Sequence, residues 1–296
     1  MSEMKKLGIV LNGGGGKGSY QIGVWKYMTE IGFDKYISVY AGSSVGALNA
    51  VLFANGDYDV AKSIWLCDDL KQKILYHTSI KQKLSAKSLF GRDGLKDIIG
   101  SINLEKIKAL KTVYATCSYF NPCIKNRSKQ LNEIPVSKAE SLNTTSIFNT
   151  ILSLLQGGFD MLFSNLAIDI NSLSSSDIIK VLLASSALPF IFPKERLFGQ
   201  NFYDGGLSDN SPVYPLIHKE HCSDIVVLHL NERSQESTYR LPSVHDIFPS
   251  RSLGSFRTGT LNFSRENAEQ NIELGYNDAR TVYASMLDEV CEKYAA

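Results

Sequence analysis

The chain has 296 residues, of which 44% are hydrophobic, and its 31 Lys and Arg residues are balanced by 30 Asp and Glu residues. This length can bury the core of one large α/β domain or of two smaller ones. A formal net charge of +1 provides no electrostatic footprint for nucleic acid, so the composition argues against a nucleic-acid partner.

The cysteines and the first residues of the chain indicate the cellular compartment in which we expect the protein. Five cysteines are scattered without a C-x-x-C pair, at Cys67, Cys117, Cys123, Cys222 and Cys291. An odd number of scattered thiols fits a reducing compartment. The apolar run at residues 7–11 is too short for the core of a signal peptide, and no apolar stretch reaches the length of a membrane span. We therefore expect a cytoplasmic protein.

Two strand–turn–helix units are predicted near the start of the chain. Residues 6–12, KLGIVLN, form a short aliphatic run typical of a buried strand, and apolar residues recur at helical spacing over residues 20–31. A second strand is predicted over residues 36–41 and a second, alanine-rich helix over residues 47–54. Strands that alternate with helices in this way indicate an α/β fold with a mostly parallel sheet.

The loop after the first strand reads GGGGKG over residues 13–18. Its Gly13, Gly15 and Gly18 match the spacing of the dinucleotide-binding fingerprint. That site also needs an acidic residue at the end of the second strand, where this chain has the sequence AGS. A phosphate-binding P-loop needs Ser or Thr after its lysine, but Lys17 is followed by glycine. A nucleotide-binding module is therefore kept only as an alternative.

The turn after the second strand has the pattern G-x-S-x-G, formed by Gly42, Ser44 and Gly46. Between a strand and a helix this pattern is typical of a nucleophile elbow, in which a strained backbone exposes the serine hydroxyl. If Ser44 attacks a carbonyl carbon, the carbonyl oxygen becomes an anion that needs hydrogen-bond donors already in place. Such donors would come from the glycine loop of the neighbouring strand, from the amides of Gly14, Gly15 and Gly16.

A serine nucleophile needs a partner that takes its proton. Four histidines follow Ser44 in the order that a Ser-His-Asp triad would allow, and none has a distinctive sequence context: His218, His221, His229 and His245. A different candidate is Asp204, which lies between two aromatic residues and two glycines in the segment FYDGG. This segment also fits an ordinary Asp-Gly turn. Two alternatives therefore remain at this point: a triad esterase that uses one of these histidines, and a hydrolase in which Asp204 is the base.

Four motifs occur in the order and approximate spacing of patatin-like phospholipases, which the chain resembles from residue 7 to about residue 210. They are the glycine loop, the G-x-S-x-G turn, the block ASSALP at residues 184–189 and the triplet Asp204-Gly205-Gly206. The resemblance implies a Ser44–Asp204 dyad without histidine, with Gly42 and Gly46 as the elbow glycines. It assigns the oxyanion hole to the loop made of Gly13, Gly14, Gly15, Gly16, Lys17 and Gly18.

The same resemblance implies a serine acyl hydrolase that cleaves fatty-acyl esters of phospholipids or lysophospholipids without a metal or other cofactor. Asp204 would take the serine proton and pass it to the leaving alcohol. The carboxylate must be partly desolvated to be basic enough, and Phe202 and Tyr203 would provide apolar cover. The expected partners are the acyl-ester substrate and, transiently, a membrane surface, so the protein would be cytoplasmic or peripheral at a membrane.

The resemblance also implies a three-layer α/β/α fold, and we expect one domain over residues 1–296 with a variable insertion at about residues 121–173. Within the insertion, residues 146–166 are apolar at helical spacing, which fits a core helix, a lid or a surface in contact with lipid. The remaining predicted elements are a strand over 112–119, a short strand pair over 121–138, a serine-capped helix over 174–185, a strand over 224–230, a polar surface segment over 231–261 and a terminal helix over 265–294.

Overall fold

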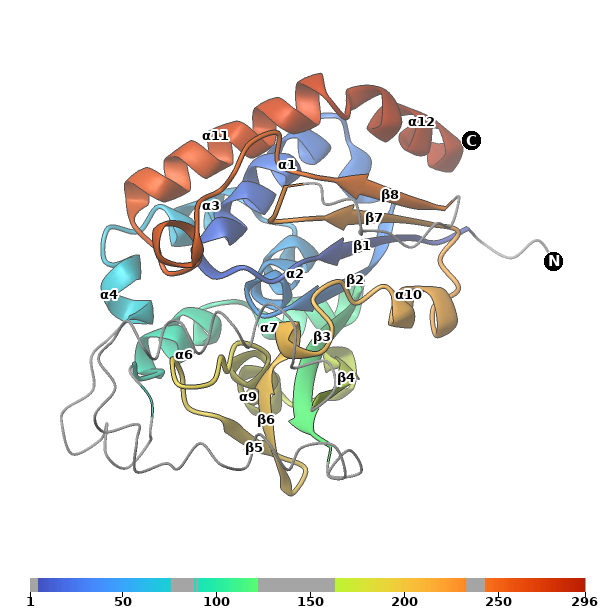
Figure 1. Cartoon of the computed structure of the whole chain (residues 1–296). Helices are drawn as coiled ribbons and strands as arrows, with labels where there is room; N and C mark the ends of the chain where they lie inside the picture. The colour runs from blue at the N-terminus through green and yellow to red at the C-terminus, as the bar shows by residue number, and fades with distance from the viewer. Residues whose placement is uncertain (1–4, 76–87, 89, 122–162, 233–242, 296) are drawn as a thin grey trace.

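The computed structural model of the chain describes residues 5–75, 88, 90–121, 163–232 and 243–295, and within them eight strands form one sheet (Figure 1). Five strands run parallel, in the order β3 (Thr112–Phe120), β2 (Ile37–Ser43), β1 (Leu7–Leu11), β7 (Asp224–Leu228) and β8 (Val244–Ile247). Three strands join in antiparallel pairs: β4 (Phe163–Asp169), β5 (Glu195–Leu197) and β6 (Gln200–Asp204). The predicted mostly parallel sheet is confirmed.

The two strand–turn–helix units at the start of the chain are confirmed. All five residues of β1 are buried, and the glycine loop after it forms η1 (Gly15–Gly18) and leads into α1 (Ser19–Glu30). After η2 (Phe33–Lys35), β2 leads through a single residue into α2 (Val45–Asn55). The elbow and the glycine loop therefore follow neighbouring parallel strands, and both lie at the carboxyl edge of the sheet.

Alternating residues of the central strands pack into two separate clusters, one on each face of the sheet. In β1, Ile9 belongs to the larger cluster and Val10 to the smaller one. The larger cluster includes residues of α1, α2, α9 (Ser175–Ser185), α11 (Arg265–Thr281) and α12 (Ala284–Ala295). The smaller cluster includes Leu216 of α10 (Tyr214–His218). Helices thus cover both faces, as a three-layer α/β/α fold requires (Figure 1).

Short helices between α2 and β3 add residues to the larger cluster. They are α3 (Tyr58–Trp65), α4 (Leu70–Ile74), α6 (Asp93–Gly100) and α7 (Leu104–Leu110). In α6 the apolar residues Leu95 and Ile99 recur four positions apart and are buried, while Asp93 and Lys96 face away. Residues of α3, α4 and α6 form part of the apolar wall of the site described below.

Two predicted segments differ in the structure. The stretch over 231–261, predicted as a polar surface segment, contributes strand β8 to the sheet and η8 (Phe256–Thr260), one turn of π-helix. Its pattern was weak because β8 has only four residues and carries His and Asp at its centre. The terminal helix is divided in two, since α11 ends at Thr281 and α12 begins at Ala284.

The predicted insertion at 121–173 is described only from residue 163 onwards, apart from Asn121. There, β4 pairs antiparallel with β3 and is followed by η6 (Ile170–Ser172). Phe163 and Leu166, assigned above to a helical apolar face, are therefore strand residues, and that part of the prediction is wrong. The rest of 146–166 and the strand pair predicted over 121–138 lie outside the described residues, apart from Asn121.

Candidate active site

Ser44 occupies the single-residue turn between β2 and α2. Its backbone angles, φ 54° and ψ −126°, are strained for a residue with a side chain. The glycines beside it are required by close backbone contacts, since a Cβ at Gly42 would lie 2.3 Å from the carbonyl oxygen of Gly46, and one at Gly46 would lie 2.0 Å from that of Leu11. The turn therefore has the geometry of a nucleophile elbow.

Strand β3 brings the ends of β2 and β6 together. The last residue of β2, Ser43, pairs with Thr116, and the last residue of β6, Asp204, pairs with Cys117. Because β2 is parallel and β6 antiparallel to β3, the two strands approach from opposite directions and end on adjacent residues of β3. The hydroxyl of Ser44 donates a hydrogen bond to Oδ2 of Asp204 at 2.7 Å. Residues 160 positions apart thus form one pair.

The ASSALP block at the end of α9 supports both members of this pair. The hydroxyl of Ser185 accepts a hydrogen bond from the backbone amide of Ser44 at 3.0 Å and donates to the carbonyl of Thr116 at 2.6 Å. Two residues later, the carbonyl of Ala187 accepts a hydrogen bond from the amide of Asp204 at 3.0 Å. Sequence reasoning found this block only through the family resemblance, because its role depends on contacts with distant strands.

The carboxylate of Asp204 is buried, with 7% of the residue exposed. Its Oδ1 accepts a hydrogen bond from the amide of Gly206 at 2.8 Å, while Oδ2 accepts from Ser44. Burial raises the pKa of Asp204 to about 6, and the two hydrogen bonds and the positive charge of Arg92 oppose this shift. Phe202, two residues before Asp204 on the same face of β6, is fully buried. The half-buried Tyr203 lies on the other face of β6.

Arg92 is a buried cation that the sequence analysis missed. It lies at the start of α6, donates a hydrogen bond to the carbonyl of Leu183 in α9 and lies 3.7 Å from the carboxylate of Glu195. Its guanidinium is 5.6 Å from the centre of the Phe192 ring. Burial lowers the pKa of Arg92 to about 10, so the side chain stays charged at neutral pH. Nothing in its local sequence distinguishes it from a surface arginine.

The glycine loop offers backbone amides next to Ser44. The amide of Gly13 donates to Oδ1 of Asn210 at 3.0 Å, so its hydrogen bond is already formed within the protein. The amides of Gly14, Gly15 and Gly16 have no hydrogen-bond acceptor among the described residues, as expected at the start of η1. Of these three residues, Gly14 and Gly15 line the same cavity as Ser44. Their amides are the candidate donors for an oxyanion.

The π-helical turn η8 packs against this loop from the far end of the chain. A Cβ at Gly15 would lie 2.1 Å from the carbonyl oxygen of Thr260, and one at Gly16 would lie 2.2 Å from that of Asn262. Gly15 also has a positive φ of 58°. The run of glycines therefore permits this close backbone contact as well as an open amide surface.

Lys17 holds the loop to the end of β7. Its Nζ donates a hydrogen bond to Oδ1 of Asn231 at 3.0 Å. Burial lowers the pKa of Lys17, an effect that the negative charge of Glu232 opposes. The next loop residue, Gly18, packs closely against Val45 at the start of α2. Of the predicted oxyanion loop, Gly13, Gly14, Gly15 and Lys17 line the cavity that includes Ser44, whereas Gly16 packs against Asn262 and Gly18 against Val45.

A cavity of about 390 Å³ joins the Ser44–Asp204 pair to an apolar wall. Its polar end, next to the pair, includes Lys17, Asn210 and Asn231. The wall includes apolar side chains from α2, α3, α4 and α6, from the segments that follow α6, α9 and β6, and from η8 and the residues that follow it. They are Val45, Leu48, Leu52, Ile64, Trp65, Leu70, Ile74, Leu95, Ile98, Ile99, Ile102, Leu188, Phe192, Leu207, Phe256, Leu261 and Phe263. An amphiphilic molecule with a long hydrocarbon chain matches this division.

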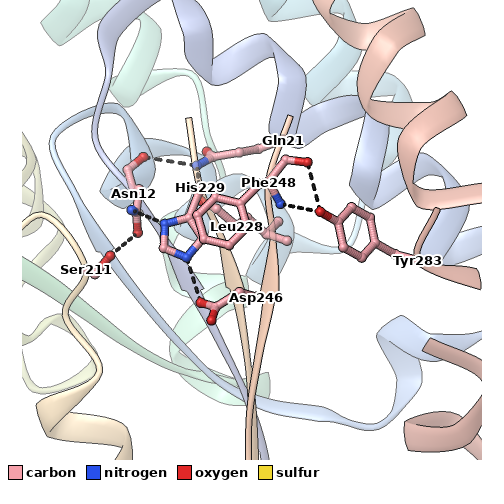
Figure 2. A network of polar contacts seen from close by, with 8 residues as sticks. All are labelled: Asn12, Gln21, Ser211, Leu228, His229, Asp246, Phe248 and Tyr283. Atoms are coloured by element: carbon pink, nitrogen blue, oxygen red, sulfur yellow. Dashed lines mark hydrogen bonds and ion pairs between the residues drawn. The ribbon is translucent and has the colours of Figure 1, made fainter. Parts of the chain in front are cut away.

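Three of the four candidate histidines contact residues other than Ser44 and Asp204. His229 contacts Asn12 and Asp246 (Figure 2), and His245 contacts Asp224 at 3.2 Å. The ring of His218 lies tilted against that of Tyr214, with ring centres 4.4 Å apart. His221 has a positive φ of 53° in the connection between α10 and β7, and His77 lies outside the described residues. The hydrogen bonds of Ser44 and Asp204 therefore favour the carboxylate over these histidines as the partner of Ser44.

No group of three His, Cys, Asp or Glu side chains in the described part of the chain is arranged to hold a metal ion. A dinucleotide site at the glycine loop would hold the ribose with an acidic side chain at the end of β2. Strand β2 ends in the sequence AGS and has no such side chain there. None of the described helices is long and apolar enough to cross a membrane.

Comparison with known proteins identifies the family model that the chain matches. A family model described as patatin-like phospholipase matches residues 9–217, a segment that includes the glycine loop, Ser44 and Asp204. Among curated protein sequences, none matches the chain.

Two solved structures align with nearly the whole of this chain. VipD from Legionella pneumophila superposes with a TM-score of 0.52 at 14% sequence identity, over 97% of this chain and 67% of the VipD chain. Human GIVD cytosolic phospholipase A2 gives a TM-score of 0.46 at 11% identity, over 97% of this chain and 60% of its own. The likeness to VipD concerns the fold, and the chain spans only part of each of these proteins.

Proposed function

Because this chain belongs to the patatin-like phospholipase family, a family of lipid acyl hydrolases, we propose that it cleaves fatty-acyl esters of phospholipids or lysophospholipids at Ser44. The observation that carries the proposal is the 2.7 Å hydrogen bond from Ser44 to Asp204. This bond lies at the polar end of a cavity whose remaining wall is apolar.

In the proposed first step, the oxygen of Ser44 attacks the ester carbonyl carbon while Asp204 takes the hydroxyl proton. The amides of Gly14 and Gly15 stabilise the negative oxygen of the tetrahedral intermediate. When the carbon–oxygen bond of the leaving alcohol breaks, Asp204 gives the proton to that alcohol. Water then attacks the acyl-serine, again with Asp204 as base, and the fatty acid leaves.

The environment of Asp204 suits this role. A carboxylate with its ordinary pKa is a poor acceptor for a serine proton, and burial raises the pKa of Asp204 to about 6. The side chain is still ionised at neutral pH, so it can accept the proton. The amide of Gly206 fixes Oδ1 of Asp204, and this keeps Oδ2 directed at Ser44.

The cavity supports a substrate with a long acyl chain. Each methylene group transferred from water to the apolar wall contributes about 0.8 kcal/mol to binding. Lys17, Asn210 and Asn231 at the polar end would contact the ester and head group. We propose that such a substrate is reached through transient contact with a membrane surface, with no resident cofactor. We further propose that the whole chain acts as one hydrolase domain.

Labelling with a fluorophosphonate followed by mass spectrometry tests the nucleophile. We expect one tag, on Ser44, and fatty-acid release from lysophospholipid that is lost in Ser44→Ala and in Asp204→Asn. Single histidine variants provide the comparison, because loss of nearly all turnover in one of them would indicate a triad. A tag on another residue contradicts the proposal. So does stabilisation by a dinucleotide without any labelling, which would favour the nucleotide-binding alternative.

A further inference from the structure

A largely buried polar network, whose residues are drawn in Figure 2, connects the ends of β1 and β7 to β8 next to the glycine loop. Its centre is Asn12, the residue between β1 and Gly13, which is only 6% exposed. Nδ2 of Asn12 contacts Nδ1 of His229 at 3.1 Å, and Oδ1 accepts a hydrogen bond from Ser211 at 2.8 Å. The backbone carbonyl accepts from Gln21 at 3.0 Å. Both the side chain and the carbonyl of Asn12 are therefore fixed.

The other side of His229 is equally constrained. Its Nε2 lies 2.7 Å from Oδ1 of Asp246, and its ring stacks on Phe248 with ring centres 4.0 Å apart. Because Asn12 offers a donor to Nδ1 and Asp246 an acceptor to Nε2, the contacts select the neutral tautomer with its proton on Nε2. His229 thus links the end of β1 to β8 through Asn12 and Asp246.

The network reaches the site at two adjacent positions. Ser211 is bonded to Asn12, and the preceding residue, Asn210, accepts the amide hydrogen of Gly13 at 3.0 Å. Residues 210 and 211 follow η7 (Gly205–Leu207), the turn that begins at Asp204. The start of the glycine loop is therefore bonded, residue by residue, to the segment that follows the proposed base.

A second branch supports the end of the loop. Oε1 of Gln21 accepts a hydrogen bond from Asn49 at 2.8 Å, and Asn49 also donates to the carbonyl of Gly18 at 2.9 Å. Oδ1 of Asn49 accepts from the indole of Trp65 at 3.0 Å, and both residues line the cavity. The loop is thus held at both ends by one connected set of buried amides.

We propose that His229 is a positioning residue for acyl transfer: with Asp246 it orients Asn12, and through Asn12 and Ser211 it sets the position of the glycine loop relative to Asp204. This inference rests on the proposed function. It assigns no proton transfer to His229, whose ring nitrogens are occupied by Asn12 and Asp246. It gives a specific role to a histidine that the sequence offered only as a rival catalytic base.

The expected signature follows from the chemistry of an oxyanion hole. Its donors act on the tetrahedral intermediate more than on the bound ester, so a small displacement of the loop lowers kcat more than it changes KM. A fluorophosphonate reacts when the oxygen of Ser44 displaces fluoride from phosphorus, and the resulting tetrahedral phosphonate ester directs a phosphoryl oxygen with partial negative charge at the same donors. Its labelling rate should therefore fall together with kcat.

The test compares His229→Phe, which retains an aromatic ring against Phe248, with His245→Phe. His245 forms the matched control because it bonds to Asp224 across the same two strands, away from the glycine loop. We expect His229→Phe to lower kcat and the labelling rate by about tenfold to a hundredfold with KM changed less than about threefold. We expect His245→Phe to change neither rate.

Conservative and indirect variants keep the inference falsifiable. His229→Asn retains an acceptor for Asn12 and should recover part of kcat, whereas His229→Ala should not. If His229→Phe does not fold, Ser211→Ala, which removes only the hydroxyl bonded to Asn12, must show the same selective loss of kcat. Unchanged kcat in variants with a lowered melting temperature would overturn the inference and leave a purely structural role. A wild-type protein that neither labels at Ser44 nor hydrolyses esters would instead refute the proposed function.

Discussion

The backbone amide of Ser44 donates a hydrogen bond to the hydroxyl of Ser185, 3.0 Å away. That hydroxyl donates in turn to the carbonyl of Thr116, so one side chain from α9 ties the elbow to β3. A residue held at φ 54° needs such support, because a strained backbone persists only where its surroundings fix it. The relationship explains why a serine at the end of a distant helix belongs to the site.

Ser185→Ala should therefore destabilise the elbow. The substitution leaves the amide of Ser44 without its acceptor, and we expect the free energy of unfolding to fall by about 1–3 kcal/mol. We also expect kcat to fall by about tenfold, because the hydroxyl of Ser44 is no longer fixed against Asp204. Urea unfolding and initial rates measure the two effects. Ser63→Ala, which removes an exposed hydroxyl bonded only within α3, should change neither.

Asp204→Asn should abolish activity and yet become more stable relative to the wild type as pH rises. Burial raises the pKa of Asp204 to about 6, so the folded state holds the proton more tightly than the unfolded state. The stabilisation that this provides is complete below the ordinary pKa of an aspartate and is lost as pH rises through about 6.

The variant has no such proton to lose, and it should gain about 2–3 kcal/mol relative to the wild type between pH 4 and pH 8. Unfolding curves at both values measure this gain. The kcat/KM of the wild type should rise through about pH 6 as the base ionises, and a flat profile there would contradict the role of Asp204 as base.

Gly15→Ala and Gly56→Ala form a matched pair of substitutions. Both glycines have positive φ, 58° and 71°, but a Cβ at Gly15 would lie 2.1 Å from the carbonyl oxygen of Thr260, whereas one at Gly56 meets nothing within 4 Å. Gly56→Ala should cost about 1–2 kcal/mol of stability and leave activity intact. Gly15→Ala should cost more and abolish turnover, since η8 and the loop must separate. Equal effects in the two variants would argue against this contact.

Substitution of Ile98 by Phe should shorten the acyl chain that the cavity accepts. Ile98 is partly exposed in α6 and lines the apolar wall, so the larger ring would occupy space within the cavity. Displacing two or three methylene groups of the substrate costs about 2 kcal/mol, or about thirtyfold in kcat/KM.

We expect that loss for a palmitoyl ester and less than about a threefold change for a butanoyl ester. Val60→Phe, at an exposed position of α3, is the control and should affect neither ester. An equal loss for both esters would mean that Ile98 does not line the acyl site.

Much of this fold could be predicted from local patterns. The aliphatic run before the glycines, the helical spacing after them and the serine cap of α9 are all encoded within short segments, and the structure confirms them. The side chain of Ser174 accepts a hydrogen bond from the amide of Asp177, as its sequence context indicates. Strand β8 was missed because four residues with a polar centre carry no clear period.

The sequence by itself determined the two strand–turn–helix units, the elbow at Ser44 and the family of the chain, because each depends on residues close together or in a fixed order. Only the tertiary structure decided which groups meet. The pairing of Ser44 with Asp204 follows from the register of β3, and the placement of Arg92, η8 and His229 follows from packing between distant segments. Such contacts depend on how whole elements align in space, and no local periodicity specifies that alignment.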